Sequence, residues 1–214
     1  ILLTSVVVIF QPELRKMLEQ LGQKKIMTTF FPLDAGKEVK ERFTDKTVNE
    51  LVKACFDMGE VKTGALIVIE QNIRLNEYER TGINVDAVLT SQLLINIFEH
   101  NTPLHDGAVL VRGNRIVAAT CYLPLSDNME LSKQLGTRHR AGVGISEVSD
   151  SLTIIVSEET GQVSVAENGK LSRGLTSAEL RAALVKAQNK KVINNSKLRH
   201  LLKGRMRREE NKAD

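Results

Sequence analysis

Apolar residues along this chain recur in two patterns, and the first is helical. Four stretches repeat apolar positions every three or four residues, which predicts helices that bury one face. Thr44 or Asp45 would cap the second of these stretches, and the capping-box pattern Thr176-Ser177-Ala178-Glu179 opens the last. Residues 131–148 are interpreted as one or two further short helices. The four stretches are residues 14–21, 45–55, 93–98 and 180–185 onward.

Short, uninterrupted apolar runs predict strands between these helices. Gly64–Ile69 is apolar throughout, as in a strand buried on both faces. Ala108–Val111 and Ile116–Leu123 flank the turn pair Gly113-Asn114, which predicts a hairpin. The polar stretch 70–84 carries no predicted element. Three more strands are expected, with the turn signal Asn168-Gly169 before the last, at residues 152–156, 163–165 and 170–171.

Consecutive hairpins favour a mixed sheet over a purely parallel one. The predicted fold class is therefore α/β, with a central mixed β-sheet flanked by helices on both faces. A length of 214 residues suits one ordinary domain with extra terminal segments, and 42% hydrophobic residues suffice for a core. Aromatic residues make up 4% and tryptophan is absent, so aliphatic side chains must form that core. Cys55 and Cys121 stand apart among apolar neighbours, which indicates buried free thiols in a reducing compartment.

The formal charge of +4 is unevenly distributed. Residues 181–214 hold 11 of the 30 basic and 3 of the 26 acidic residues, a net of +8, so the remaining residues carry a net of −4. A basic tail can contact nucleic acid or anionic lipid, but a solvated helix end followed by disordered residues is the simpler explanation. The acidic body argues against nucleic acid as the partner of the folded domain.

Residues 1–10 are nearly all apolar, yet they lack the basic n-region and the cleavage site of a signal peptide. A helix needs about 20 residues to span a bilayer, so this run is too short to do so by itself. It is either the first element of the core or the end of a membrane helix from a longer chain.

Three familiar motifs are missing from the chain. It has no Gly-x-x-x-x-Gly-Lys-Ser/Thr loop, no Gly-x-Gly-x-x-Gly after a strand and no Gly-x-Ser-x-Gly elbow.

The first candidate site is instead His105-Asp106-Gly107, just before a predicted strand. Asp106 can bind a divalent cation or accept a proton from a hydroxyl, and His105 can be a metal ligand or a second base. Gly107 lets a ligand lie against backbone. The alternative is an ordinary Asp-Gly turn beside a loop histidine.

The second candidate is Thr137-Arg138-His139-Arg140, which small residues bracket on both sides. Two guanidiniums and the threonine hydroxyl can engage the oxygens of a triphosphate. If the cluster opens a helix, its backbone N–H groups add to the anion site. The alternative is a solvated basic helix end.

The third candidate is Ser157-Glu158-Glu159, which ends the apolar run that begins at residue 152. With strand alternation, Ser157 and Glu159 share a face, where the serine could donate to phosphate and the glutamate could lie near a metal. The alternative is that these polar residues simply terminate the strand.

The first two motifs resemble those of one known family. Asp106-Gly107-Ala108 and Thr137-Arg138-His139-Arg140 are similar to the Asp-Gly-Ala and Arg-His-Arg motifs of the diadenylate cyclase (DAC) family, in particular its membrane-anchored CdaA type. The similarity covers roughly residues 1–175 and implies a DAC-type fold. Further matching segments are Phe10–Arg15, Gly64–Ile67, His100–His105, Tyr122–Pro124 and Ser157–Gly161.

This resemblance implies an enzyme that condenses two ATP molecules into cyclic di-AMP and releases two pyrophosphates, with a divalent metal, Mn²⁺ or Mg²⁺. One chain holds one ATP, so a head-to-head homodimer or higher oligomer is also implied. A non-catalytic nucleotide-binding regulatory module is the alternative. The membrane type further implies a location on the cytoplasmic face of the bacterial cell membrane, attached through an upstream segment. Regulatory protein partners, and no nucleic acid, are expected.

By the same resemblance, individual residues acquire roles. The expected domains are the end of a membrane helix with a connecting amphipathic helix at 1–20, a catalytic domain at 21–185 and a basic tail at 186–214. The metal ligands would be His105 and Asp106. The catalytic residues would be Asp106, Arg138, His139 and Arg140. The substrate-binding residues would be Gly107, Ala108, Tyr122, Leu123, Thr137, Ser157 and Glu159.

Overall fold

The computed structural model describes residues 41–132 and 135–189 of the 214-residue chain. The predictions for residues 1–20, among them the helix at 14–21, and for the tail from residue 190 onward lie outside these ranges. Within the described ranges, no helix has the length and apolar character that a membrane crossing needs.

The described residues form seven strands and five helices. Every element predicted within them is present, with ends shifted by a few residues. The strands are β1 (Ala65–Ile69), β2 (Ile83–Val88), β3 (Ala108–Arg112), β4 (Arg115–Cys121), β5 (Leu152–Val156), β6 (Val163–Glu167) and β7 (Lys170–Ser172). The helices are α4 (Asp45–Glu60), α5 (Asn76–Glu79), α6 (Ser91–Phe98), α7 (Thr137–Val148) and α8 (Ser177–Gln188).

The strands form one sheet in the order β2-β4-β3-β1-β5-β6-β7. The pair β1–β3 is parallel, and the other neighbouring pairs are antiparallel. The predicted mixed sheet is therefore confirmed. The β1–β3 pair can be parallel because the chain crosses from β1 to β3 through α5, β2 and α6 instead of through a tight hairpin.

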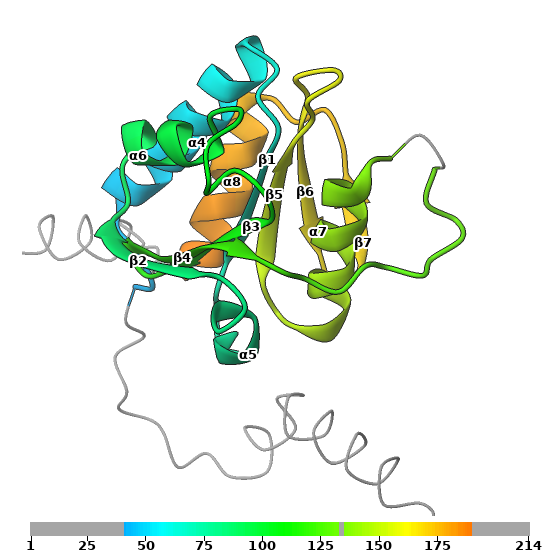
Figure 1. Ribbon diagram of the computed structural model, residues 1–214, viewed down its shortest axis with the longest axis horizontal. Helices are drawn as coiled ribbons and strands as arrows, with labels where there is room; N and C mark the ends of the chain where they lie inside the picture. Colours follow the sequence, from blue (N-terminus) through cyan, green and yellow to red (C-terminus); the bar gives the residue numbers. More distant parts are fainter. Residues whose placement is uncertain (1–40, 133–134, 190–214) are drawn as a thin grey trace, which may run out of the picture.

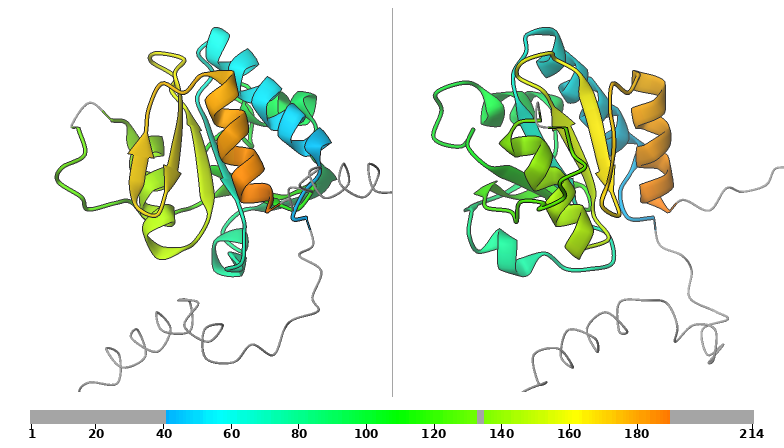
Figure 2. Two further views of the ribbon diagram at one scale, coloured as in Figure 1. Left: turned by 180° about the vertical axis from the view of Figure 1, so that it is seen from behind. Right: turned by 90° about the vertical axis from the view of Figure 1, so that its right-hand side faces the viewer.

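Helices cover both faces of this sheet, as predicted. The views in Figures 1 and 2 place α4, α6 and α8 on one face and α7 on the other. The central strand β1 contributes to both cores, since Ile67 packs in the cluster with α4 and Leu66 packs in the cluster with α7. Cys55 and Cys121 are buried free thiols, as expected.

Two elements in the polar stretch after β1 had no sequence prediction. Strand β2 lies at the edge of the sheet and buries none of its side chains fully, so it lacks the apolar run that marks the inner strands. Its pairing with β4 is interrupted between Asn84 and Ala87, and Asp86 has a positive φ of 42° at the irregularity. Helix α5 is a single turn without a buried residue.

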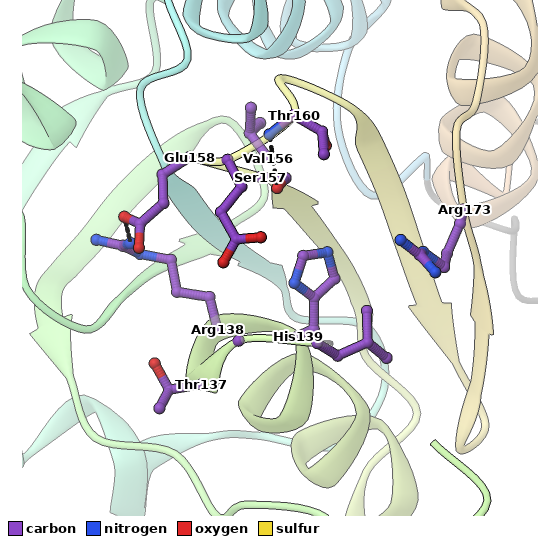
Figure 3. Close-up of a pocket in the computed structure, with 11 residues that line it drawn as sticks. Thr137, Arg138, His139, Val156, Ser157, Glu158, Thr160 and Arg173 are labelled. Atoms are coloured by element: carbon purple, nitrogen blue, oxygen red, sulfur yellow. Dashed lines mark hydrogen bonds and ion pairs between the residues drawn. The ribbon is translucent and has the colours of Figure 1, made fainter. Parts of the chain in front are cut away.

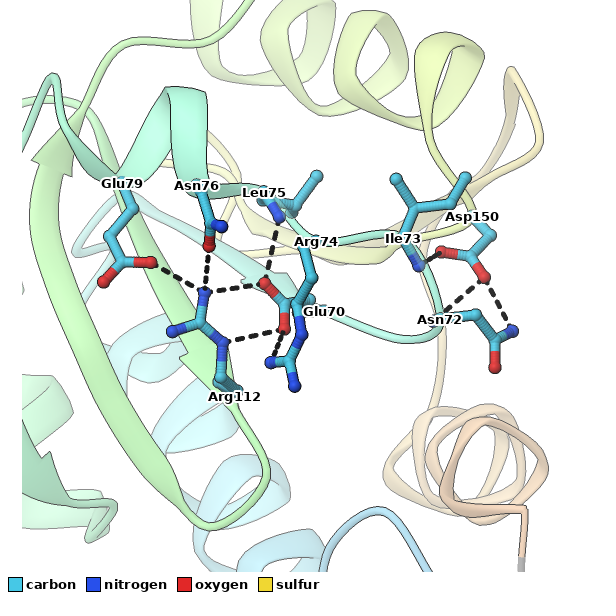
Figure 4. Close-up of polar contacts among 9 residues, drawn as sticks. All are labelled: Glu70, Asn72, Ile73, Arg74, Leu75, Asn76, Glu79, Arg112 and Asp150. Atoms are coloured by element: carbon cyan, nitrogen blue, oxygen red, sulfur yellow. Dashed lines mark hydrogen bonds and ion pairs between the residues drawn. The ribbon is translucent and has the colours of Figure 1, made fainter. Parts of the chain in front are cut away.

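A polar network holds this stretch against the sheet (Figure 4). The Glu70 side chain, only 5% exposed, accepts two hydrogen bonds from Arg112, at 2.8 and 2.9 Å, and one from the Leu75 N–H at 3.0 Å. Arg112 also bonds Glu79 of α5 at 2.7 Å. The threonine after α5, Thr81, accepts a 2.9 Å hydrogen bond from the backbone N–H of Tyr122. The network therefore connects the centre of the sheet to the segment that follows β4.

Candidate active site

Asp106 and Gly107 lie immediately before β3, in the connection from α6. Gly107 has a φ of +92°, and a Cβ there would stand 2.9 Å from the carbonyl oxygen of Cys121 and 2.9 Å from the carbonyl carbon of Thr120. The end of β4 thus leaves no room for a side chain at this position. Asp106 itself remains 81% exposed, so its carboxylate stands at the mouth of the strand and can meet a ligand.

His105 places a nitrogen beside this carboxylate. Its Nδ1 is 2.6 Å from the carbonyl oxygen of Thr102, which can only accept, so Nδ1 carries the proton and donates. In the neutral imidazole Nε2 then carries the lone pair, and this nitrogen lies 3.4 Å from Asp106 Oδ1. The ring of His100 packs edge-on against that of His105 with centroids 5.7 Å apart. A histidine oriented through Nδ1 in this way is the usual arrangement of a metal-ligating imidazole.

The N-terminus of α7 is an open anion site. Gly136 is its N-cap, and no side chain in the described part of the chain caps it. The N–H groups of His139 and Arg140 bond the Gly136 carbonyl, so those of Thr137 and Arg138 lie at the free end of the helix dipole. His139 is buried, and this burial, followed by the positive charge of Arg173, lowers the pKa of its imidazole despite the opposing effect of Glu159. His139 is therefore neutral at pH 7.

Two adjoining cavities bring these segments together. The larger has a volume of about 540 Å³ and is bordered by His105, Asp106 and Gly107 on one side and by the start of α7 on another. The smaller, about 110 Å³, lies between the start of α7, the turn after β5 and Arg173 (Figure 3). Thr137, Arg138 and Glu158 border both cavities. Residues from all three candidate segments thus border the larger cavity.

An ion pair stands at the boundary between the cavities. Arg138 Nη1 donates to Glu158 Oε2, while the buried Nε of Arg138 has no hydrogen-bond partner among the described residues. Gly64, just before β1, packs against this pair, because a Cβ there would lie 2.7 Å from Arg138 Nη1. Within the described part of the chain, only Nη1 of this guanidinium donates a hydrogen bond, so its other Nη group can donate to a ligand in the cavities.

The other predicted residues fall into three groups. Tyr122 and Leu123 border the larger cavity, and Ser157 and Glu159 border the smaller. Ala108 is fully buried at the start of β3 and borders neither of these two cavities. The shared strand face expected for Ser157 and Glu159 is wrong, because β5 ends at Val156 and the chain turns at 158–160.

Arg140 also borders neither of these cavities. Because Arg140 follows Arg138 by two residues in α7, the two side chains point about 200° apart around the helix axis. On the side of Arg140, α7 packs against the 124–126 segment, where the Arg140 carbonyl accepts from the Ser126 N–H at 3.0 Å. A catalytic role for Arg140 stays a prediction, because its side chain does not border either cavity beside Arg138.

Sequence reasoning had not assigned roles to Glu158 and Arg173. Glu158 lay within a motif singled out, but strand alternation placed it on the wrong face. Arg173 follows β7, more than thirty residues from Arg138, and no local pattern marks it. Only the spatial approach of the β5 turn, the β7 end and α7 reveals both.

A helix N-terminus, an arginine and a strand-end carboxylate around one cavity of a mixed α/β domain are typical of nucleotide-binding proteins. The sequence model of one family, DAC, described as DisA bacterial checkpoint controller nucleotide-binding, matches residues 52–171. The chain belongs to this family, which confirms the resemblance of its motifs to those of the diadenylate cyclases.

Curated relatives and a solved structure agree with that assignment. The chain is 49% identical over 201 residues to the cyclic di-AMP synthase CdaA of Bacillus subtilis, covering 94% of this chain and 71% of that protein. It is 48% identical over 182 residues to a diadenylate cyclase of Listeria monocytogenes, covering 85% of this chain and 64% of that one. A crystal structure of a double mutant of DacA from Staphylococcus aureus superposes with a TM-score of 0.66 at 48% identity, covering 67% of this chain and 96% of that one.

Proposed function

We propose that this chain is a diadenylate cyclase that condenses two ATP molecules into cyclic di-AMP and two pyrophosphates. One observation carries the proposal: Asp106 and the positive N-terminus of α7 border the same cavity of about 540 Å³. That volume lies within the range of about 300–1,000 Å³ typical of small-molecule sites. The names of the curated relatives support the same activity.

The cavity offers different surroundings to the two halves of ATP. Leu123, Tyr122 and the backbone at Gly107 supply the apolar walls and close backbone approach that a nucleoside needs. Thr137 and Arg138 supply a hydroxyl, a guanidinium and helix N–H groups for the phosphates. We therefore orient the nucleoside toward Asp106 and the triphosphate toward α7.

The reaction consists of two equivalent displacements. In each, the 3′-oxygen of one ATP forms a bond to the α-phosphorus of the other, and the bond from that phosphorus to the β-phosphate oxygen breaks. The 3′-hydroxyl proton is accepted by Asp106, whose exposed carboxylate can approach the hydroxyl. Alignment of the two nucleotides and neutralisation of the phosphate charge provide the remaining acceleration.

A divalent cation fits the donors at Asp106 and His105. Nε2 of His105 and Oδ1 of Asp106 lie 3.4 Å apart, a spacing that suits two ligands of one ion. No group of three or more histidine, cysteine or acidic side chains within the described ranges could hold a metal, so phosphate oxygens and water would complete the coordination. When bound, Mn²⁺ or Mg²⁺ would supply positive charge at the phosphates.

Substitution of Asp106 by asparagine tests the proposal, because it removes the charge and the basicity with little change in shape. With ATP and Mn²⁺, cyclic di-AMP formation followed by mass spectrometry is expected to fall at least about a hundredfold. ATP binding, measured by calorimetry without divalent metal, is expected to persist. Asp57→Asn makes the same change at an exposed position on α4, across the sheet from the site, and should retain activity.

Each outcome distinguishes between specific alternatives. Normal product from the Asp106→Asn variant would remove Asp106 from the chemistry. ATP binding by the unmodified chain, without product at any protein concentration, would instead favour a non-catalytic nucleotide-binding module.

A further inference from the structure

The smaller cavity beside α7 is built from three separate segments. These are the start of α7, the turn after β5 and the residue that follows β7. Its volume of about 110 Å³ is too small for a nucleoside but suits phosphate groups. It opens next to the larger cavity across Arg138, so a triphosphate that begins in one can extend into the other.

The cation of the smaller cavity that has no ion-pair partner among the described residues does not come from the Arg138-His139-Arg140 motif. Arg138 is already engaged by Glu158, Arg140 lies outside, and the buried imidazole of His139 is neutral. Arg173 is the cation on the opposite wall, and it has no ion-pair partner in the part of the chain that the structure describes. Figure 3 shows its guanidinium turned from the end of β7 toward His139.

Arg173 is held in place by the backbone on both sides. Before it, Ser172 is paired with Val165 in the β6–β7 ladder. After it, the Leu175 N–H donates to the Val163 carbonyl at 2.9 Å. A surface arginine on a mobile loop would lose much entropy on binding, whereas this backbone is already fixed where it meets the cavity.

We infer that Arg173 binds the terminal phosphates of ATP, opposite Arg138 and the N-terminus of α7. The inference rests on the proposed function, because it identifies which part of the substrate this cavity takes. An arginine offers two parallel N–H donors to phosphate oxygens. Ser157 can add a third donor, since its Oγ already accepts from the Thr160 N–H at 3.3 Å and its own proton remains available.

This inference extends the site beyond the segment that defines the family. The family match ends at residue 171, so Arg173 lies just outside it. It also separates two tasks. Arg138, at the boundary of both cavities, would hold the phosphate nearer the nucleoside, and Arg173 would hold the phosphates that leave as pyrophosphate.

The test compares two ligands that differ only in those terminal phosphates. 3′-Deoxy-ATP and 3′-deoxy-AMP both lack the attacking hydroxyl, so binding can be measured by calorimetry without turnover. In the Arg173→Met variant, affinity for 3′-deoxy-ATP is expected to fall about tenfold, and affinity for 3′-deoxy-AMP should stay within about twofold. Arg173→Lys keeps the charge without the fork and should be intermediate.

Arg181→Met is the matched control, because it removes an exposed arginine of α8 that bonds Asn49 away from both cavities. It should bind both ligands as the unmodified chain does. Equal 3′-deoxy-ATP affinity in the Arg173→Met and Arg181→Met variants would overturn the inference, as would an equal loss for both ligands. Failure of the unmodified chain to make cyclic di-AMP would contradict the proposed function and leave this binding comparison valid.

Discussion

At the scale of single residues, the ion pair between Arg138 and Glu158 depends on a glycine in another element. Gly64 lies before β1, where a Cβ would stand 2.7 Å from Arg138 Nη1 and 2.9 Å from Glu158 Oε2. Both contacts are with the far ends of flexible side chains rather than with backbone. A methyl group there would therefore displace the guanidinium while leaving the fold intact.

The Gly64→Ala variant is expected to lose function more than stability. Moving Arg138 away from the phosphates should lower kcat/KM for ATP by about tenfold. The melting temperature should change by only a few degrees. Steady-state kinetics and thermal unfolding, measured on the same sample, check both parts.

Gly142→Ala is the opposing control, since it adds the same methyl group to the buried face of α7. Its Cβ would stand 2.9 Å from Ile155 Cδ1 in the core, so overpacking should cost about 1–3 kcal/mol of unfolding free energy. Activity per folded molecule should remain close to that of the unmodified chain. A Gly64→Ala variant with full activity would show that Arg138 need not hold its present position.

Sequence patterns indicated which residues border the larger cavity where chemistry and local pattern coincide. Asp106, Gly107 and Thr137 stood out as a carboxylate, a flexible backbone point and a helix start, and all three border the larger cavity. Ala108 and Arg140 belonged to the same motifs but border neither cavity, because burial and helix rotation act residue by residue. A linear motif specifies neighbours in sequence, and it cannot specify which of them face a common space.

At the scale of elements, the β3–β4 hairpin contains two arginines with contrasting environments. Arg112 and Arg115 are directly paired across its end. Arg112 bonds the buried Glu70, whereas Arg115 pairs on the surface with Asp86, and both of those side chains are largely exposed. Only the first pair leaves a buried charge behind when its arginine is removed.

The Arg112→Met variant should therefore lose about 3 kcal/mol of unfolding free energy, measured by urea denaturation at pH 7. Arg115→Met, the same change one position across the hairpin, should lose less than about 1 kcal/mol. Equal losses would show that Glu70 obtains enough stabilisation from Arg74 and the Leu75 N–H alone.

Acid should reduce the difference between Arg112→Met and the unmodified chain. Burial by itself raises the pKa of Glu70, but the hydrogen bonds from Arg112 and the Leu75 N–H outweigh it, and the pKa is lowered. A lowered carboxyl pKa contributes stability above the unfolded value of about 4.3, and this contribution is lost as pH falls. Urea midpoints between pH 7 and pH 3 should therefore converge for the two proteins.

Sequence patterns predicted the buried elements and missed two exposed ones. The inner strands and α4 carry continuous or periodic apolar residues, and these were predicted close to their observed bounds. The edge strand β2 and the one-turn helix α5 are held by the Glu70 network and by pairing with β4, which are contacts with distant residues. Such elements leave no periodic signal in their own sequence.

At the scale of the whole molecule, one cavity per chain explains only half of the proposed reaction. Condensation joins two nucleotides, and we propose that the exposed Asp106 of one chain meets a nucleotide held by a second copy. Apolar side chains that border the larger cavity lie exposed, Tyr122 by 71% and Leu125 by 55%. Met129, four residues further along the same segment, is 90% exposed. Exposed apolar groups beside a half-site are typical of a surface that a second copy covers.

Specific activity is therefore expected to rise with protein concentration until dimers saturate. Met129→Asp should shift this rise to higher concentration, because it places a charge at the proposed contact. Binding of 3′-deoxy-ATP per chain should be preserved, since Met129 borders neither cavity. Val185→Asp, at an exposed apolar position of α8 on the other face of the sheet, should leave both quantities unchanged. Sedimentation measured alongside product formation relates activity to the fraction of chains in dimers. If specific activity stayed constant down to concentrations at which the protein is fully monomeric, the face-to-face arrangement would be refuted.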